Sequence, residues 1–61
     1  MPIVRVEMFS GRSSEQKAEL AKAITDAVVR IAKTSADATT VIFCDIDKGN
    51  WADAGELASE S

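Results

Sequence analysis

The sequence predicts one small α+β domain over residues 1–61, with a strand, a long helix, a second strand and a short C-terminal hairpin in that order. Three observations carry this prediction. Apolar and polar side chains alternate over residues 2–9, apolar residues recur at helical spacing between residues 13 and 33, and β-branched residues are frequent over residues 39–46. With 61 residues, the chain has room for a single domain only.

The first predicted strand covers residues 2–9. Its side chains alternate between two faces, with Val4, Val6 and Met8 on one and Ile3, Arg5, Glu7 and Phe9 on the other. Pro2 is compatible with the start of a strand, where a missing N–H donor disturbs little. Residues 10–11 (Ser-Gly) end the strand in a turn.

A helix follows over residues 13–33. Ser13 is a good N-cap, and Gln16 three residues later completes a capping box. Asp26 and Arg30 have the i,i+4 spacing of a supporting ion pair. The apolar residues recur at helical spacing and form one stripe: Leu20, Ile24, Ala27, Val28 and Ile31. Residues 34–38 form the exit loop.

The second predicted strand covers residues 39–46. Its two faces carry Thr40, Ile42, Cys44 and Ile46 on one side and Val41, Phe43 and Asp45 on the other. A strand–helix–strand order with a long crossover indicates two parallel strands in a right-handed unit. Residues 48–50 are predicted as a turn and residues 51–57 as a short hairpin arm. The tail, residues 58–61, has no structural signal and is expected to fray.

This chain is expected to form an oligomer. A domain of this size buries little of its surface, and natural proteins this small usually add a disulfide, a metal or a partner subunit. Cys44 is the only cysteine and there is no histidine, so an intrachain disulfide and a zinc site are both excluded. A two-stranded sheet also leaves open edges. Two copies side by side would give a four-stranded, ferredoxin-like sheet with two helices.

Composition excludes several other classes. The net charge is −3 with scattered cations, which argues against nucleic-acid binding. Apolar runs are far too short to span a membrane, and residues 1–5 do not read as a secretory signal. The free thiol of Cys44 therefore suggests a cytoplasmic protein. Without histidine, His-based acid–base chemistry and Ser/His/Asp triads are excluded.

Four residues are candidates for chemistry, and each also has a plain interpretation. Removal of Met1 would make Pro2 an N-terminal secondary amine that titrates near neutrality, although a proline at this position is common and often has no role. Arg12, just before the helix, could bind a carboxylate together with helix N–H groups, or it could be a solvated turn residue. Trp51 could wall a pocket or anchor a subunit contact. Cys44 is best interpreted as a small buried apolar residue.

Taken together, these features resemble the 4-oxalocrotonate tautomerase family. The resemblance covers essentially the whole chain. Its most specific part is residues 11–17 (Gly-Arg-Ser-Ser-Glu-Gln-Lys), and it is supported by Pro2 directly after Met1, by residues 48–51 (Lys-Gly-Asn-Trp) and by residues 55–59 (Gly-Glu-Leu-Ala-Ser).

The resemblance implies an isomerase that needs no cofactor or metal. Pro2 would be the general base that moves a proton within 2-hydroxydienoate or 2-oxo acid substrates such as 2-hydroxymuconate, which occur in the degradation of aromatic compounds. Arg12 would bind a substrate carboxylate, Trp51 would replace the usual phenylalanine wall, and the backbone N–H near Phe9 would order a water or a substrate oxygen. Family members are typically hexamers, trimers of dimers, whose active sites draw on more than one subunit.

The chain departs from the family at one position. The characterised enzyme has a second arginine, contributed by a neighbouring subunit, where this chain has Thr40, and no arginine follows Arg30. Arg5 is a poor substitute because it points to the strand face opposite to that of Pro2. We therefore expect slower turnover of the dicarboxylate and comparable turnover of monocarboxylate enols such as phenylpyruvate.

Two alternatives remain open at this point. The scaffold could catalyse hydration or dehalogenation of an unsaturated acid, for which Asp53 is the nearest carboxylate that could activate water. The chain could also be a subunit of a hetero-oligomer, in which a companion chain supplies the second arginine, or an inert structural subunit.

Overall fold

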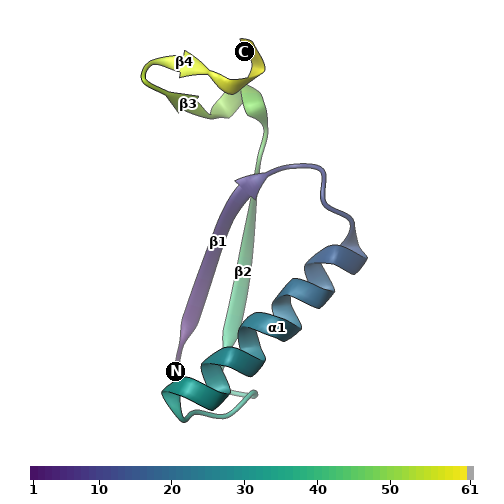
Figure 1. The fold of residues 1–61 in the computed structure, drawn as a ribbon, viewed down its shortest axis with the longest axis vertical. Helices are drawn as coiled ribbons and strands as arrows, with labels where there is room; N and C mark the ends of the chain where they lie inside the picture. The colour runs from purple at the N-terminus through teal and green to yellow at the C-terminus, as the bar shows by residue number, and fades with distance from the viewer. Residues whose placement is uncertain (61) are drawn as a thin grey trace.

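The computed structural model describes residues 1–60, and its elements follow the predicted order (Figure 1). The β-α-β unit consists of β1 (Ile3–Phe9), α1 (Ser14–Ala32) and β2 (Thr40–Ile46). The C-terminal part contains a 3₁₀ helix, η1 (Lys48–Asn50), the strands β3 (Ala52–Asp53) and β4 (Glu56–Leu57), and a second 3₁₀ helix, η2 (Ala58–Glu60). The predicted α+β class and the β-α-β order with a C-terminal hairpin are confirmed.

Strands β1 and β2 pair in parallel along their whole length. Ile3 lies opposite Thr40 at one end of the sheet, and Phe9 lies opposite Ile46 at the other. Two backbone bonds extend the ladder by one residue at each end. The Thr40 N–H donates to the Pro2 carbonyl at 3.0 Å, and the Ser10 N–H donates to the Ile46 carbonyl, also at 3.0 Å. The sheet therefore fixes the backbone of Pro2 at one end and that of Ser10 at the other.

The two sheet faces differ as the alternation predicts. On the face towards the helix, Val4, Val6 and Phe43 are half-buried, and the Lys17 ammonium of α1 forms an ion pair with the Asp45 carboxylate of β2. The opposite face is not covered by the helix. It carries Ile3, which is 62% exposed, and the Arg5 guanidinium, whose Nη1 lies 3.7 Å from the Cys44 Sγ.

Helix α1 begins at the predicted capping box. The Gln16 N–H donates to the Ser13 Oγ at 3.1 Å, and the Ser13 N–H donates to the Gln16 Oε1 at 2.9 Å. The predicted ion pair of Asp26 with Arg30 is wrong, because the Asp26 carboxylate instead contacts the Lys22 ammonium one turn earlier, at 3.3 Å. Arg30 lies in the last turn, where the free carbonyl oxygens attract a cation.

A single copy of the chain has no closed core. No side chain among residues 1–60 is fully buried, and the ends of the helical stripe, Leu20 and Ile31, are 38% and 67% exposed. The radius of gyration is 14.5 Å, whereas a compact domain of this length has about 10.5 Å. A sheet of two strands is about as wide as one helix, so it cannot cover the whole stripe.

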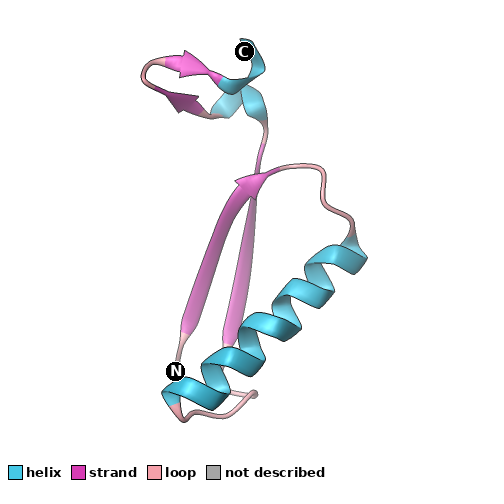
Figure 2. Cartoon of the chain, viewed as in Figure 1, coloured by secondary structure: helices cyan, strands magenta, loops and turns pink. Residues whose placement is uncertain are grey.

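The C-terminal arm extends past the end of the sheet, away from α1 (Figure 2). Strands β3 and β4 pair antiparallel through a two-residue turn, in which Ala54 and Gly55 have φ of 54° and 81°. Two positive φ angles are typical of the hairpin turns that suit strand twist. The expected fraying of the tail is wrong for residues 58–60, which form η2 and are tied back by the Ala58 N–H to the Trp51 carbonyl at 2.8 Å. Ser61 of the predicted tail lies outside the described residues.

Candidate active site

Pro2 lies at the start of β1 and is half-buried. Its carbonyl is held by the Thr40 N–H, so the ring has a fixed place beside the first residue of β2. In the 61-residue chain Met1 precedes Pro2, and its side chain is 93% exposed. The proline nitrogen is then an amide without basic character, and only cleavage after Met1 would turn it into an amine.

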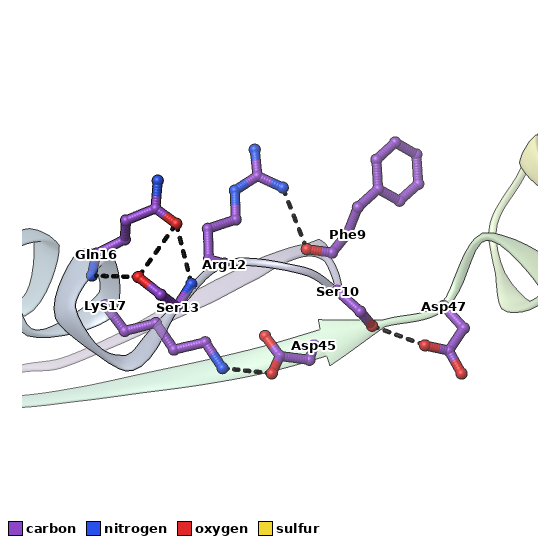
Figure 3. Close-up of polar contacts among 8 residues, drawn as sticks. All are labelled: Phe9, Ser10, Arg12, Ser13, Gln16, Lys17, Asp45 and Asp47. Carbon is purple, nitrogen blue, oxygen red and sulfur yellow. Dashed lines mark hydrogen bonds and ion pairs between the residues drawn. The ribbon is translucent and has the colours of Figure 1, made fainter.

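Arg12 lies past the opposite end of β1, in the turn that leads into α1. Its guanidinium Nη1 donates to the Phe9 carbonyl at 3.2 Å, and Figure 3 shows the side chain turned back towards the strand end. Gly11 allows this turn because its φ is +123°, a conformation that other residues avoid. A second bond fixes the same turn to the end of β2, since the Ser10 Oγ donates to Asp47 Oδ1 at 2.7 Å. Arg12 is exposed, so it can also reach a ligand.

Trp51 packs on Phe9 at this same end of the sheet. The two ring centroids are 4.5 Å apart, with an angle of 55° between the planes. The indole Nε1–H donates to Asp53 Oδ2 at 3.1 Å, so the ring is held from the side of the hairpin as well. The Lys48 ammonium lies 5.6 Å from the Phe9 ring centroid, within the range of a cation–π contact.

Two open hollows flank this aromatic pair. One, of about 270 Å³, is lined by Phe9, Lys48 and residues of the hairpin arm. The other, of about 290 Å³, is lined by Trp51 together with Glu7 and Ile46 from the uncovered sheet face. Asp53 contributes to both hollows. The sequence did not single out Lys48 as a cation beside Phe9. The available signal was its position three residues before Trp51, which η1 converts into proximity.

Of the four residues to which the family resemblance assigns a role, the structure brings three together and leaves the fourth apart. Phe9, Arg12 and Trp51 cluster at the carboxyl end of β1, whereas Pro2 precedes its amino end. Strand geometry of about 3.3 Å per residue places Pro2 about 23 Å along the strand from Phe9. Within a single copy, Pro2 therefore does not reach the other three predicted site residues.

Within residues 1–60 the structure shows no group of three or more Cys, Asp or Glu side chains arranged to hold a metal ion. Over the same residues, no helix combines the length and the apolar character that a membrane span requires.

Comparison with known proteins gives a consistent result. A sequence profile described as "Tautomerase enzyme" matches residues 2–60. Among curated proteins, the chain is similar to a probable tautomerase of Streptococcus thermophilus, with 39% identity over 61 residues and full coverage of both chains. A probable tautomerase of Streptococcus agalactiae is 44% identical over 57 residues, which cover 93% of this chain and 95% of that protein.

Solved structures agree in fold. YwhB, a homologue of 4-oxalocrotonate tautomerase, superposes with a TM-score of 0.94 and is 33% identical, with 98% of each chain covered. A heterohexamer 4-oxalocrotonate tautomerase from Chloroflexus aurantiacus superposes with a TM-score of 0.91 and is 32% identical over 98% of this chain and 97% of that one. Sequence and fold give the same answer over nearly the whole length: the chain belongs to the tautomerase family.

Proposed function

We propose that this protein is a keto–enol tautomerase that moves a proton within 2-hydroxydienoate or 2-oxo acid substrates such as 2-hydroxymuconate, with the Pro2 amine as general base. Family membership carries the proposal. It is supported by the position of Arg12, whose exposed guanidinium donates to the backbone carbonyl of Phe9, the residue whose ring packs on Trp51.

The separation of Pro2 from this cluster supports a site that two copies of the chain share. In two copies whose β1 strands run antiparallel side by side, Pro2 of each copy lies beside the Phe9–Arg12 end of the other. The proposal therefore includes a homo-oligomer built from such dimers, and a trimer of dimers is the expected form. A heterohexamer exists among the solved relatives, so a hexamer with a companion chain is the alternative.

The proton transfer follows from these groups. The unprotonated Pro2 nitrogen takes the proton from the 2-hydroxyl of the enol, and electron density moves along the conjugated chain. The Pro2 ammonium then returns a proton to a carbon further along, which gives the 2-oxo acid and regenerates the amine. Arg12 binds the carboxylate, and the Trp51 and Phe9 rings exclude water, which keeps the amine uncharged at neutral pH.

Thr40 bears on the rates expected with dicarboxylate and monocarboxylate substrates. A hydroxyl replaces the family's second guanidinium at this position, so a developing negative charge on the 2-oxo group receives one charged donor fewer. Losing such a donor costs about a hundredfold or more in rate. We therefore expect monocarboxylate enols such as phenylpyruvate to be turned over comparably to the dicarboxylate.

Chemical synthesis tests the role of the amine, because a chain of 61 residues can be made with and without Met1. Both chains are refolded, their masses are verified, and the decay of the enol absorbance of each substrate is followed. The chain that begins at Pro2 should accelerate ketonisation, and the chain that retains Met1 should not. Equal acceleration by both chains would remove Pro2 from the mechanism.

A second candidate activity is hydration or dehalogenation of an unsaturated acid, favoured by one observation. Asp53 accepts the Trp51 indole N–H at 3.1 Å through one carboxylate oxygen, and its other oxygen is left to bind water beside the aromatic wall. In this reaction Asp53 would take a proton from the attacking water while the Pro2 ammonium protonates the neighbouring carbon. Asp53→Asn should abolish hydration and spare tautomerisation. Loss of both activities, or of neither, would exclude Asp53 as the base.

A cytoplasmic location is also part of the proposal. Cys44 is the only cysteine and its thiol is half-buried and free, as expected in a reducing compartment.

A further inference from the structure

Lys48 brings a second cation to the end of the sheet that carries Arg12. Its ammonium lies 5.6 Å from the centroid of the Phe9 ring, and the Arg12 guanidinium donates to the carbonyl of that same residue at 3.2 Å. Both cationic side chains are exposed. Two positive charges therefore lie around Phe9, one at its backbone and one at its ring.

A hydrogen bond joins the two turns that carry these cations. The Ser10 Oγ, two residues before Arg12, donates at 2.7 Å to the Oδ1 of Asp47, which directly precedes Lys48 (Figure 3). The Asn50 N–H donates to the Asp47 carbonyl at 2.8 Å and closes η1. These bonds hold Arg12 and Lys48 at the same end of the sheet, although the two residues are far apart in the sequence.

The charge of Lys48 is not neutralised by an ion pair among residues 1–60. Lys17 and Lys22 each form one, with carboxylates of β2 and α1. The acidic residues Asp47 and Asp53 each accept a hydrogen bond from another side chain instead. An aromatic ring attracts an ammonium group but has no net charge, so the positive charge of Lys48 remains available to an anion.

Lys48 also lines the hollow of about 270 Å³ at this end of the sheet. Phe9 and Leu57 give this hollow apolar surface, and Glu56 adds a negative charge to it. The volume is just below the range of about 300–1,000 Å³ that is usual for pockets of drug-sized ligands. The hollow therefore suits one end of a small unsaturated acid, with the ammonium as the group that attracts it.

The other cations of the chain do not offer this combination. A substrate with two carboxylates needs a second cation besides Arg12, and Thr40 cannot supply one. The remaining Lys and Arg side chains line neither hollow and belong to the uncovered sheet face or to α1 and its end: Arg5, Lys17, Lys22, Arg30 and Lys33. Within one copy, Lys48 is therefore the cation that accompanies Arg12.

We propose that Lys48 binds the second carboxylate of a dicarboxylate substrate. Arg12 binds the first carboxylate, the carbon chain lies along the Phe9 ring, and the second carboxylate enters the hollow beside the ammonium. This inference deepens the proposed function, on which its catalytic meaning rests. The second carboxylate has the same charge before and during the proton transfer, so this contact stabilises substrate and transition state alike. It should lower KM for the dicarboxylate and leave kcat unchanged.

A matched pair of unreactive acids tests the contact apart from catalysis. Muconate has a carboxylate at each end of a conjugated diene, and sorbate has the same diene with a methyl group in place of one carboxylate. Neither acid has the 2-hydroxyl from which the reaction starts. Trp51 is the only tryptophan, so its fluorescence reports the binding of each acid to assembled protein without Met1. The wild type should bind muconate at least about fivefold more tightly than sorbate.

Variants of the two charged residues of the hollow give effects of opposite sign. Lys48→Gln should weaken muconate binding by about fivefold, the upper end of the effect of an exposed ion pair, and should leave sorbate binding within about twofold. Lys48→Arg, which keeps the charge, should retain the affinity of the wild type. Glu56→Gln removes the negative charge and should tighten muconate binding by about twofold or more.

Lys22→Gln is the matched control, because it makes the same charge change on the exposed surface of α1 and outside both hollows. It should change the affinity for neither acid. Equal weakening of muconate and sorbate binding by Lys48→Gln would assign Lys48 to packing on Phe9 and overturn the inference. An unchanged affinity of Lys48→Gln for muconate, an equal loss in Lys48→Arg, or no preference of the wild type for muconate would also overturn it.

The test remains decisive if Lys48→Gln fails to assemble. Glu56→Gln keeps Lys48 in place, and an unchanged affinity of this variant for muconate would then overturn the inference. Because neither acid is turned over, failure of Pro2 as the base would leave these affinities as they are. Conversely, failure of the Lys48 contact would leave the Pro2-dependent ketonisation of phenylpyruvate enol as it is.

Discussion

Phe9 and Trp51 are in tilted ring contact, with centroids 4.5 Å apart, although one ends the first strand and the other follows the second. This contact joins the C-terminal arm to the end of the sheet. It also places an aromatic surface next to the Arg12 guanidinium, which is bonded to the Phe9 carbonyl. The arm therefore belongs to the candidate site rather than to a separate tail.

Replacing Trp51 tests the aromatic wall. Trp51→Ala should lower kcat/KM by about tenfold or more, because water then reaches the amine and favours its charged form. Trp51→Phe, which keeps a ring on Phe9, should retain most of the activity. Steady-state rates of enol decay measure both variants. Equal losses of kcat/KM in both variants would show that activity depends on the hydrogen bond of the Trp51 indole N–H with Asp53 and not on the aromatic wall.

Arg12 is expected to act through its charge and its planar shape. Arg12→Ala should reduce kcat/KM by about a hundredfold, the usual effect of removing a charged donor from a transition state. Arg12→Lys keeps the charge but not the two-pronged geometry, so its activity should lie between the wild type and alanine. A change confined to protein yield, with normal kcat/KM in the folded fraction, would assign Arg12 to the turn alone.

The Thr40 position offers a gain of function. Thr40→Arg restores the guanidinium of the family pattern at an exposed position, and we expect at least about a tenfold rise in kcat/KM for 2-hydroxymuconate. Phenylpyruvate enol develops the same charge on its 2-oxygen, so its rate should rise as well. Thr40→Lys controls for charge alone. No rise with either substrate would mean that a side chain at position 40 does not reach the developing charge.

The capping box predicts a stability effect that is separate from catalysis. Ser13→Ala removes the acceptor of the Gln16 N–H, and it should lower the free energy of unfolding by about 1 kcal/mol per chain. Ser13→Asp, which keeps an N-cap acceptor, should lose little. Thermal unfolding must be compared at one protein concentration, because an oligomer's melting temperature depends on it. An unchanged melting temperature for Ser13→Ala would contradict the role of this cap.

Local features of the fold could be predicted from the sequence. Neighbouring residues alone determine the Ser13–Gln16 capping box and the alternation around Val4 and Val6. The parallel β-α-β order depends on a single crossover. The ordered tail could not be predicted in this way. Residues 58–60 are held by the Ala58 N–H bond to the Trp51 carbonyl, which only the folded arm brings into place.

The set of site residues stays a prediction, and its arrangement could not be derived from the sequence. Residue type singled out Pro2, Arg12 and Trp51, and the family resemblance added Phe9, yet no local pattern reveals that Pro2 lies at the far end of β1 from the other three. The length of β1 keeps Pro2 apart from the other three residues within one chain. In the proposed function, a second copy of the chain brings them together.

The central claim is that the Pro2 amine moves the proton, and replacing Pro2 in the mature protein tests it most directly. Protein that lacks Met1, verified by intact mass, is compared with Pro2→Ala by following the decay of 2-hydroxymuconate and of phenylpyruvate enol. The alanine variant lacks the ring that fixes the position of the amine nitrogen, so we expect the rate to fall by about a hundredfold or more with both substrates. Native mass spectrometry should show the same assembly for both proteins. Equal rates in correctly processed, equally assembled proteins would contradict the account.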